Sequence, residues 1–320
     1  MIKPDDFAAF RALSAALGSD PLRVQGPGGN TSIKQGGAMW IKASGTELAD
    51  AQARDIFVAV NRDAARAEAF GTGDGSCKTT VLDPANTLRP SIETTFHAAL
   101  EWSVVAHSHS IATLTHGVSP TGRAALDKKL AGLPFVRVPY AKPGLPLTRE
   151  ILARITAETQ IIVLENHGLI CCANSVPEVA TLIEEVEARL ALPVLRGHTS
   201  LPASPAPDGF HWADESWIAQ DTCISALAIG GSYYPDHVVF LGAALPTVDD
   251  GTVPTVLVDG TGILLRIGAT PSQRAMLRCL SDMLVRLPQD WVPQAIGTKA
   301  EAELLNWDAE KYRQALAARP

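Results

Sequence analysis

The chain has 320 residues, of which 46% are hydrophobic and 19% are charged, so it can bury a sizeable core in one large domain or two ordinary ones. Its formal net charge of -7 and the lack of any Lys/Arg run argue against nucleic acid as a partner. No apolar run approaches the roughly 18 residues of a membrane span, and the N-terminus lacks the apolar core of a secretory signal. The five cysteines fit buried, reduced thiols. We therefore expect a cytoplasmic protein without a membrane partner.

Apolar residues recur at helical or strand spacing through the first 200 residues. The spacing predicts helices over 4–17, 89–100, 110–116, 121–131, 147–158 and 176–192. A glycine-rich turn over 26–34 enters a strand, and further strands are predicted over 39–42, 56–60, 103–106, within 135–144, and over 161–164. These elements place the polar motifs of the chain at strand ends and at the start of one helix.

Residues 197–209 are rich in Pro, Ser and Gly, which indicates a linker or domain boundary. We therefore expect one domain over 1–200 and a smaller α+β domain over 210–320. In the second domain we expect helices over 214–229, 271–287 and 299–317, a strand at Val238–Leu241, and a hairpin over 255–268 that turns at Asp259-Gly260.

Histidines follow two of the predicted strands. His107 and His109 are separated by one residue, and side chains alternate along an extended chain, so both imidazoles point to the same side and Ser108 points to the other. His167 stands beyond the strand over 161–164. Three imidazoles with an open fourth position are typical of a catalytic zinc site, and Glu93, on the helix before His107, could act as its base. The residues alone also allow hydrogen-bonded loop histidines without a metal.

Three turns carry groups that suit an anion. Asn30 lies in a glycine-rich turn, and Ser44 and Gly45 lie in the turn after the next strand. Ser91 lies in the first turn of the helix that carries Glu93, where unpaired N–H groups and the helix dipole favour an anion. Together the three turns could form a phosphate cradle, and the alternative is that each is an ordinary turn.

Taken together, these motifs resemble the class II aldolase/adducin family, which includes fuculose-phosphate and rhamnulose-phosphate aldolases and ribulose-phosphate 4-epimerase. The resemblance covers about residues 5–200 and is carried by GGNTS (28–32), KASGTE (42–47), RPSIETTFHAAL (89–100), VVAHSHS (104–110) and ENHGLI (165–170). The fold it implies is α/β, an α/β/α sandwich around a mixed, mainly antiparallel sheet. It also implies a homotetramer.

The resemblance implies a role for each candidate residue. His107, His109 and His167 would bind Zn²⁺ or another divalent metal such as Mn²⁺ or Co²⁺, and Glu93 would be the catalytic acid/base. The phosphate site would comprise Asn30, Ser44, Gly45 and Ser91. Where the aldolases usually carry two serines before the glutamate, this sequence has Pro90-Ser91, which leaves open whether the substrate is phosphorylated.

The function these features predict is a divalent-metal-dependent aldolase that cleaves a sugar or sugar phosphate by retro-aldol chemistry through a metal-stabilised enediolate. The alternatives are an epimerase, dehydratase or decarboxylase on the same metal site, or a non-catalytic adducin-like interaction module. Residues 210–320 resemble the segment after the aldolase domain in aldolase–short-chain-dehydrogenase fusions, so we also expect a separate dehydrogenase to work beside this protein.

Overall fold

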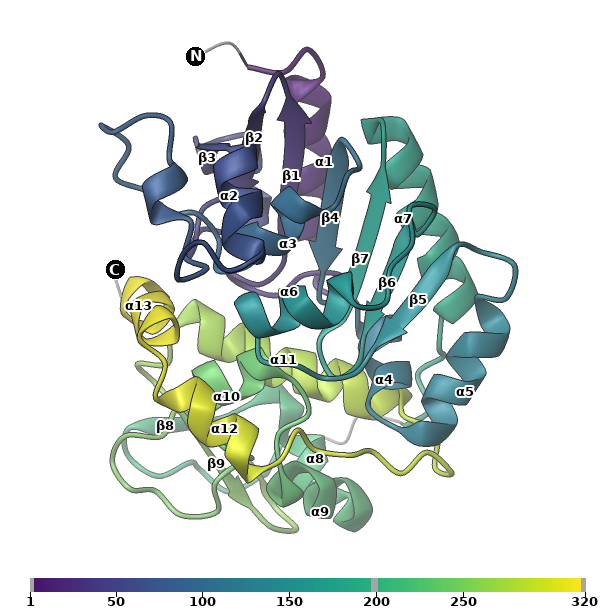
Figure 1. Cartoon of the computed structure of the whole chain (residues 1–320). Helices are drawn as coiled ribbons and strands as arrows, with labels where there is room; N and C mark the ends of the chain where they lie inside the picture. The colour runs from purple at the N-terminus through teal and green to yellow at the C-terminus, as the bar shows by residue number, and fades with distance from the viewer. Residues whose placement is uncertain (1–2, 197–200, 318–320) are drawn as a thin grey trace.

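The computed structural model describes residues 3–196 and 201–317 and is built around a seven-stranded sheet (Figure 1). The strand order is β3-β2-β1-β4-β7-β6-β5. Only β5 and β6 pair in parallel, and the other neighbours are antiparallel, which confirms the predicted mixed, mainly antiparallel sheet. The strands are β1 (Asn30–Gln35), β2 (Ala38–Lys42), β3 (Phe57–Asn61), β4 (Val104–Ser108), β5 (Phe135–Val138), β6 (Ile161–Leu164) and β7 (Gly168–Ala173).

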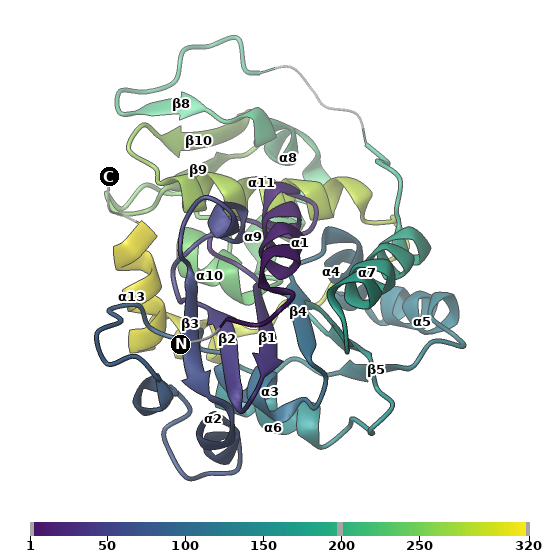
Figure 2. The same cartoon turned by 90° about the horizontal axis from the view of Figure 1, so that it is seen from above.

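Helices cover both faces of this sheet, as the predicted α/β/α sandwich requires (Figures 1 and 2). Strand alternation sorts the apolar side chains, so that Val104 and Ala106 pack on one face while Val105 packs on the other against Phe96. The first face is covered by α1 (Phe7–Ser19), α5 (Pro120–Lys129) and α7 (Val176–Leu190). The second face is covered by α2 (Arg62–Ala69), α3 (Thr94–Ala99) and α6 (Leu145–Leu152).

The C-terminal third forms a second cluster of helices with a three-stranded sheet in the order β8-β10-β9. This cluster lies below the large sheet in Figure 1 and shares a hydrophobic core with α4 (Ile111–Gly117). Its elements are β8 (Phe210–Trp212), β9 (Thr255–Val258), β10 (Gly262–Arg266), α8 (Trp217–Gln220), α9 (Thr222–Gly230), α10 (Pro235–Leu241), α11 (Pro271–Arg286), α12 (Thr298–Leu305) and α13 (Asp308–Ala317). The predicted hairpin over 255–268 corresponds to β9 and β10.

The predicted linker lies only partly within the described residues. Residues 197–200 fall outside them, and residues 201–209 contain no helix or strand. The division into two domains stays a prediction. Among the described helices none is both long enough and apolar enough to cross a membrane.

Several sequence predictions need correction. The helix expected over 89–100 comprises only Thr94–Ala99, so Ser91 precedes it and does not lie in its first turn. Helix α2 was not predicted, and the helix expected over 214–229 is divided into α8 and α9. The predicted strand at Val238–Leu241 is wrong, because these residues belong to helix α10, which starts at Pro235. All seven residues of α10 are buried, and the apolar run of a short buried helix has the same pattern as a buried strand. Strand β7 was not predicted at all. The single helix expected over 299–317 is two helices, α12 and α13.

Candidate metal centre

The predicted site residues come from strand ends that meet at one edge of the large sheet. His107 pairs with Asn30 at the start of β1 and with Ile170 of β7. Because β4 and β7 are antiparallel, the end of β4 and the start of β7 lie side by side. His109 stands one residue beyond β4, and His167 stands one residue before β7. The sheet topology therefore brings the three histidines together from opposite chain directions.

The turn that carries His167 is anchored to the C-terminal third. Asn166 adopts a left-handed φ of 56°, which asparagine tolerates better than most residues. Its side-chain Nδ2 donates hydrogen bonds to the carbonyl oxygens of Tyr233 at 3.0 Å and Gln294 at 2.9 Å. The position of His167 thus depends on contacts that the C-terminal segment provides.

The three imidazoles form a compact buried cluster. The ring centroids of His107, His109 and His167 lie 5.0, 5.0 and 5.2 Å apart, and one potential ligand atom from each lies within 4.8 Å of the other two. All three are buried. Burial lowers the pKa of His109 and of His167 to about 3, so both rings are neutral near pH 7, which is the form that binds a metal ion.

Hydrogen bonding leaves a ring nitrogen free to act as a ligand. His107 Nδ1 donates to the carbonyl oxygen of Leu169 at 3.0 Å, so the lone pair of that ring is on Nε2. This Nε2 atom is buried and has no hydrogen-bond partner among the described residues. An unpaired buried acceptor is costly unless a ligand satisfies it, and histidine nitrogens are common ligands of divalent ions. The three residues could therefore hold a metal ion, and this donor set fits one.

Glu93 faces the same space. It precedes α3, and its carboxylate lies with Oε2 at 3.5 Å from His107 Nε2 and Oε1 at 3.7 Å from His167 Nε2. Asn30 Nδ2 donates to Oε2 at 2.8 Å, whereas Oε1 has no hydrogen-bond partner. The side chain of Glu93 is buried. One carboxylate oxygen is thus fixed by Asn30, and the other remains free to exchange a proton or bind a metal.

The four residues predicted to bind phosphate line one small cavity together with Glu93, His109 and His167. We call it the inner cavity; its volume is about 30 Å³, and its four predicted residues are Asn30, Ser44, Gly45 and Ser91. Asn30 is held from two sides, since its Nδ2 donates to Ser91 Oγ at 3.2 Å while its Oδ1 contacts His97 Nε2. His97 therefore supports the side chain of Asn30.

Three charged residues of the inner cavity were not predicted as site residues: Lys42, Asp236 and Arg313. Asp236 Oδ2 lies 3.4 Å from His109 Nδ1. Arg313 donates to both carboxylate oxygens of Asp236, at 2.9 and 3.1 Å, and to Glu310 Oε2 at 2.8 Å. All of these side chains are buried. The C-terminal third therefore places a charged network directly behind one of the three histidines.

Electrostatics fix the charge states in this network. Burial alone would raise the pKa of Asp236, but the Arg313 guanidinium holds that pKa well below its ordinary value. Burial also raises the pKa of Glu310, to about 7. Asp236 is thus an anion near neutral pH, and a hydrogen on His109 Nδ1 faces it. The lone pair of His109 then lies on Nε2, to which Gly29 N–H donates only a long bond of 3.4 Å.

Local sequence contains a signal for Asp236 as a buried charge, but none for its partner Arg313. Asp236 lies in a short segment otherwise rich in apolar residues, and buried charges are nearly always paired. The two residues are 77 positions apart, however, and Asp236 lay beside the segment predicted as a strand. Nothing in local spacing would have placed either residue beside His109.

Comparison with known proteins places these observations in a family. The model of the Class II Aldolase and Adducin N-terminal domain matches residues 13–193. The N-terminal class II aldolase domain of a conserved protein from Thermoplasma acidophilum superposes with a TM-score of 0.52 at 28% identity, covering 59% of this chain and 94% of that one.

Two curated relatives are also similar in sequence. An uncharacterized oxidoreductase, YuxG, from Bacillus subtilis (strain 168) is 30% identical over 176 residues, which is 49% of this chain and 25% of that protein. A 3-oxo-tetronate 4-phosphate decarboxylase from Escherichia coli (strain K12) is 30% identical over 125 residues, which is 34% of this chain and 57% of that protein. The chain spans less than two thirds of the length of either relative.

Proposed function

Because the chain belongs to the class II aldolase and adducin family, we propose that it is a divalent-metal-dependent lyase that cleaves a sugar or sugar phosphate by retro-aldol chemistry. The observation that carries the proposal is the unpaired, buried Nε2 of His107 beside the Glu93 carboxylate, whose free oxygen, Oε1, lies 3.7 Å from His167 Nε2. A scaffold protein has no need of three converging imidazoles with a carboxylate on their open side. A catalytic metal site needs both.

Each residue of the site has a role in this proposal. His107, His109 and His167 would hold the ion, which when bound would polarise the substrate carbonyl and stabilise the negative charge that develops as the carbon–carbon bond breaks. Glu93 transfers the proton at the carbon left electron-rich by cleavage, using the oxygen that Asn30 does not hold.

The surrounding residues orient these groups. Asp236 faces Nδ1 of His109, an arrangement that keeps the other ring nitrogen directed at the ion. Asn30 fixes the Glu93 carboxylate and is itself held by His97 and Ser91. The network therefore limits the rotation of the base and of one ligand before substrate arrives.

A decarboxylase is the second candidate, supported by the 30% identity to the 3-oxo-tetronate 4-phosphate decarboxylase. Loss of carbon dioxide and retro-aldol cleavage both leave an electron pair on the carbon next to a carbonyl, so the same site serves either reaction. An epimerase or a dehydratase on this site would use the same proton transfer at Glu93. We propose Zn²⁺ as the ion, with Mn²⁺ or Co²⁺ as alternatives.

The assembly of the protein is part of the same proposal. The similarity to YuxG, which bears the name of an oxidoreductase and is much longer than the matched region, supports a dehydrogenase as functional partner. We propose a cytoplasmic homotetramer that works beside such an enzyme. Size-exclusion chromatography with light scattering measures the first of these properties directly.

The test is product analysis by mass spectrometry after metal-loaded protein is incubated with a panel of ketoses, ketose phosphates and phosphorylated 3-oxo sugar acids, the last of which carry the carboxylate that a decarboxylase removes. Cleavage fragments are the expected result, whereas loss of carbon dioxide would identify the decarboxylase and an isomer of equal mass would identify an epimerase. Replacing the base, Glu93→Gln, is expected to lower turnover by roughly 10²–10⁴-fold with metal content retained. The exposed Glu158 provides the matched control, Glu158→Gln. Full turnover in Glu93→Gln would rule out the assigned role.

A further inference from the structure

A second, larger cavity lies next to the inner cavity. Its volume is about 340 Å³, and Ser44, Ile92 and Pro143 line both cavities. We call it the outer cavity. Helix α13 borders both spaces, since Tyr312 lines the outer cavity and the next residue, Arg313, lines the inner one. A volume of this size accommodates a small organic ligand, whereas about 30 Å³ holds little more than an ion or one or two waters.

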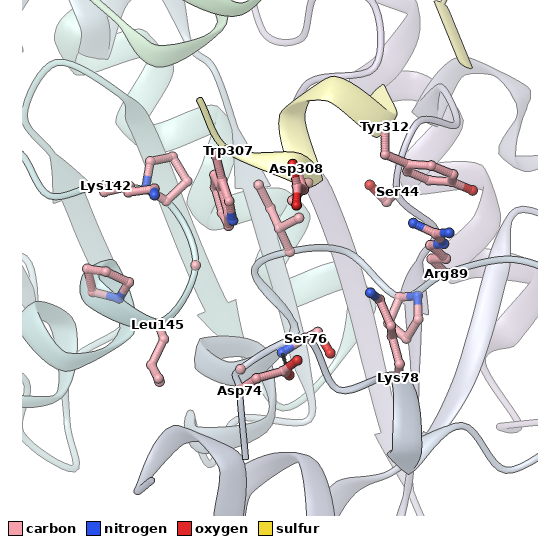
Figure 3. Close-up of a pocket in the computed structure, with 17 residues that line it drawn as sticks. Ser44, Asp74, Ser76, Lys78, Arg89, Lys142, Leu145, Trp307, Asp308 and Tyr312 are labelled. Carbon is pink, nitrogen blue, oxygen red and sulfur yellow. Dashed lines mark hydrogen bonds between the residues drawn. The ribbon is translucent and has the colours of Figure 1, made fainter. Parts of the chain in front are cut away.

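The outer cavity is lined by three cations that form no salt bridge among the described residues, although Lys78 interacts electrostatically with Asp74 of the same lining. Lys78, Arg89 and Lys142 line it, and none of them forms an ion pair with a carboxylate in residues 3–196 or 201–317. Figure 3 shows Arg89 and Lys78 projecting from one side and Lys142 from the opposite side. The two carboxylates of the lining, Asp74 and Asp308, leave a local excess of one positive charge in a chain of net charge -7.

Aromatic rings hold two of these cations in place. The Arg89 guanidinium lies 3.9 Å from the centroid of the Tyr312 ring, and Lys142 Nζ lies 4.4 Å from the centroid of the Trp307 ring. Both rings border α13 or belong to it, so the C-terminal segment positions the cations as well as enclosing the cavity (Figure 3). Cations fixed in this way lose little freedom when they bind an anion.

The inner cavity, by contrast, has few free donors for an anion. Asn30 Nδ2 already donates to Ser91 and Glu93, and Ser44 N–H donates to the carbonyl oxygen of Arg89 at 2.9 Å. Gly45 is covered by α13, because a Cβ at this position would lie only 2.3 Å from Leu316 Cδ1. The guanidinium of Arg313, finally, is already paired with two carboxylates.

We propose that the outer cavity binds the anionic group of the substrate, a phosphate or a carboxylate, through Arg89 and Lys78. The reacting carbons of the same molecule then lie toward the histidine cluster, across Ser44 and Ile92. This inference rests on the proposed function, because it assigns the substrate class of that site. The substrate is thus an acidic, polyhydroxylated compound rather than a neutral sugar, and its anion does not bind at Asn30, Ser91 and Gly45.

Binding can be tested without turnover. Metal-loaded protein is titrated calorimetrically with glycerol 3-phosphate, glycerate and glycerol, which lack a ketone or aldehyde group and cannot be cleaved by a retro-aldol reaction. We expect glycerol 3-phosphate or glycerate to bind at least tenfold more tightly than glycerol, and the tighter of the two identifies the anion. Arg89→Met and Lys78→Met are each expected to weaken that binding by about 5–10-fold. Lys128→Met, which removes an exposed lysine of α5, provides the matched control and is expected to change nothing.

Results that overturn anion binding in the outer cavity can be distinguished from results that overturn the proposed lyase reaction. Equal binding by Arg89→Met, Lys78→Met and Lys128→Met, or no binding of either anion by the wild type, would overturn the inference. So would a loss of anion binding in Ser91→Ala with retention in Arg89→Met, because the anion would then lie in the inner cavity. If the variants behave as expected but no panel substrate is cleaved, the outer site holds and the proposed reaction fails.

Discussion

Asp236→Asn tests whether a residue that orients His109, without itself binding the metal, affects metal binding. The substitution keeps the shape of the side chain and removes one charge from a buried network. In the wild type the carboxylate contacts His109 Nδ1 at 3.4 Å and accepts two hydrogen bonds from Arg313. The amide can still face His109, but it can present a donor to the ring, and it leaves Arg313 with Glu310 as its only carboxylate.

We expect this substitution to lower both the stability of the protein and its affinity for the metal. Breaking a buried ion pair by removing one charge costs about 3–5 kcal/mol of folding free energy. Loss of a carboxylate that orients a metal-binding histidine weakens metal binding by roughly 10–100-fold. The matched control is Glu310→Gln, which alters the same arginine pair but does not face His109. Because burial raises the pKa of Glu310 to about 7, a neutral amide imitates a form that is already populated at neutral pH.

The assay measures stability and metal affinity on the same three proteins. Urea unfolding reports the stability, and competition with a chromogenic chelator reports the affinity for Zn²⁺ or Co²⁺. We expect Asp236→Asn to lower both quantities and Glu310→Gln to lower stability modestly at unchanged affinity. An Asp236→Asn protein that binds metal within twofold of the wild type would refute the proposed orientation of His109. Equal weakening in both variants would also refute it, since the effect would then follow from loosening of α13.

Three further predictions concern the cover of the site, a buried lysine and the core. Leu316→Ala removes the side chain packed on Gly45 and is expected to speed metal removal by a chelator several-fold. The control, Leu305→Ala at an exposed leucine of α12, should leave the rate unchanged. Equal rates in the two variants would show that Leu316 does not cover the site. Burial lowers the pKa of Lys34 from 10.5 to about 7, so the unfolded chain binds this proton more tightly and stability rises with pH from about 7 to 10.5. Lys34→Met should flatten that rise in urea unfolding across this pH range. An unchanged slope would rule out a lowered pKa for Lys34. Phe10→Ala, at a fully buried ring, is expected to cost about 3–5 kcal/mol in the same assay, and a cost below 1 kcal/mol would contradict the packing of α1 on the sheet.

The spacing of residues along the sequence was sufficient to predict the part of the site that lies on and just before β4. The alternation of His107 and His109 around Ser108 follows from strand geometry alone, and Glu93, at the start of α3, is close enough in sequence for its approach to be anticipated. His167 required the family resemblance, because strand β7, which fixes its turn beside β4, was not predicted. A strand that follows a tight turn with only Asn166 and Gly168 as signals is easily read as loop.

The C-terminal contribution to the site could not be anticipated from spacing. Asp236, paired with Arg313, reaches His109 through the tertiary packing of α10 and α13. Both segments were assigned incorrectly, one as a strand and the other as part of a longer helix. A buried short helix and a buried strand have the same apolar pattern. The covering of Gly45 by Leu316 likewise depends on that packing. The sequence therefore did not indicate that α13 covers the inner cavity at Gly45.

The central claim is that His107, His109 and His167 bind a catalytic divalent ion, and metal analysis tests it most directly. Protein purified without chelator is analysed by inductively coupled plasma mass spectrometry beside His167→Ala. We expect close to one divalent ion per wild-type chain and a loss of most of it in the variant. A wild-type protein without stoichiometric metal, even after incubation with Zn²⁺, Mn²⁺ or Co²⁺, would contradict the account and favour a non-catalytic interaction module.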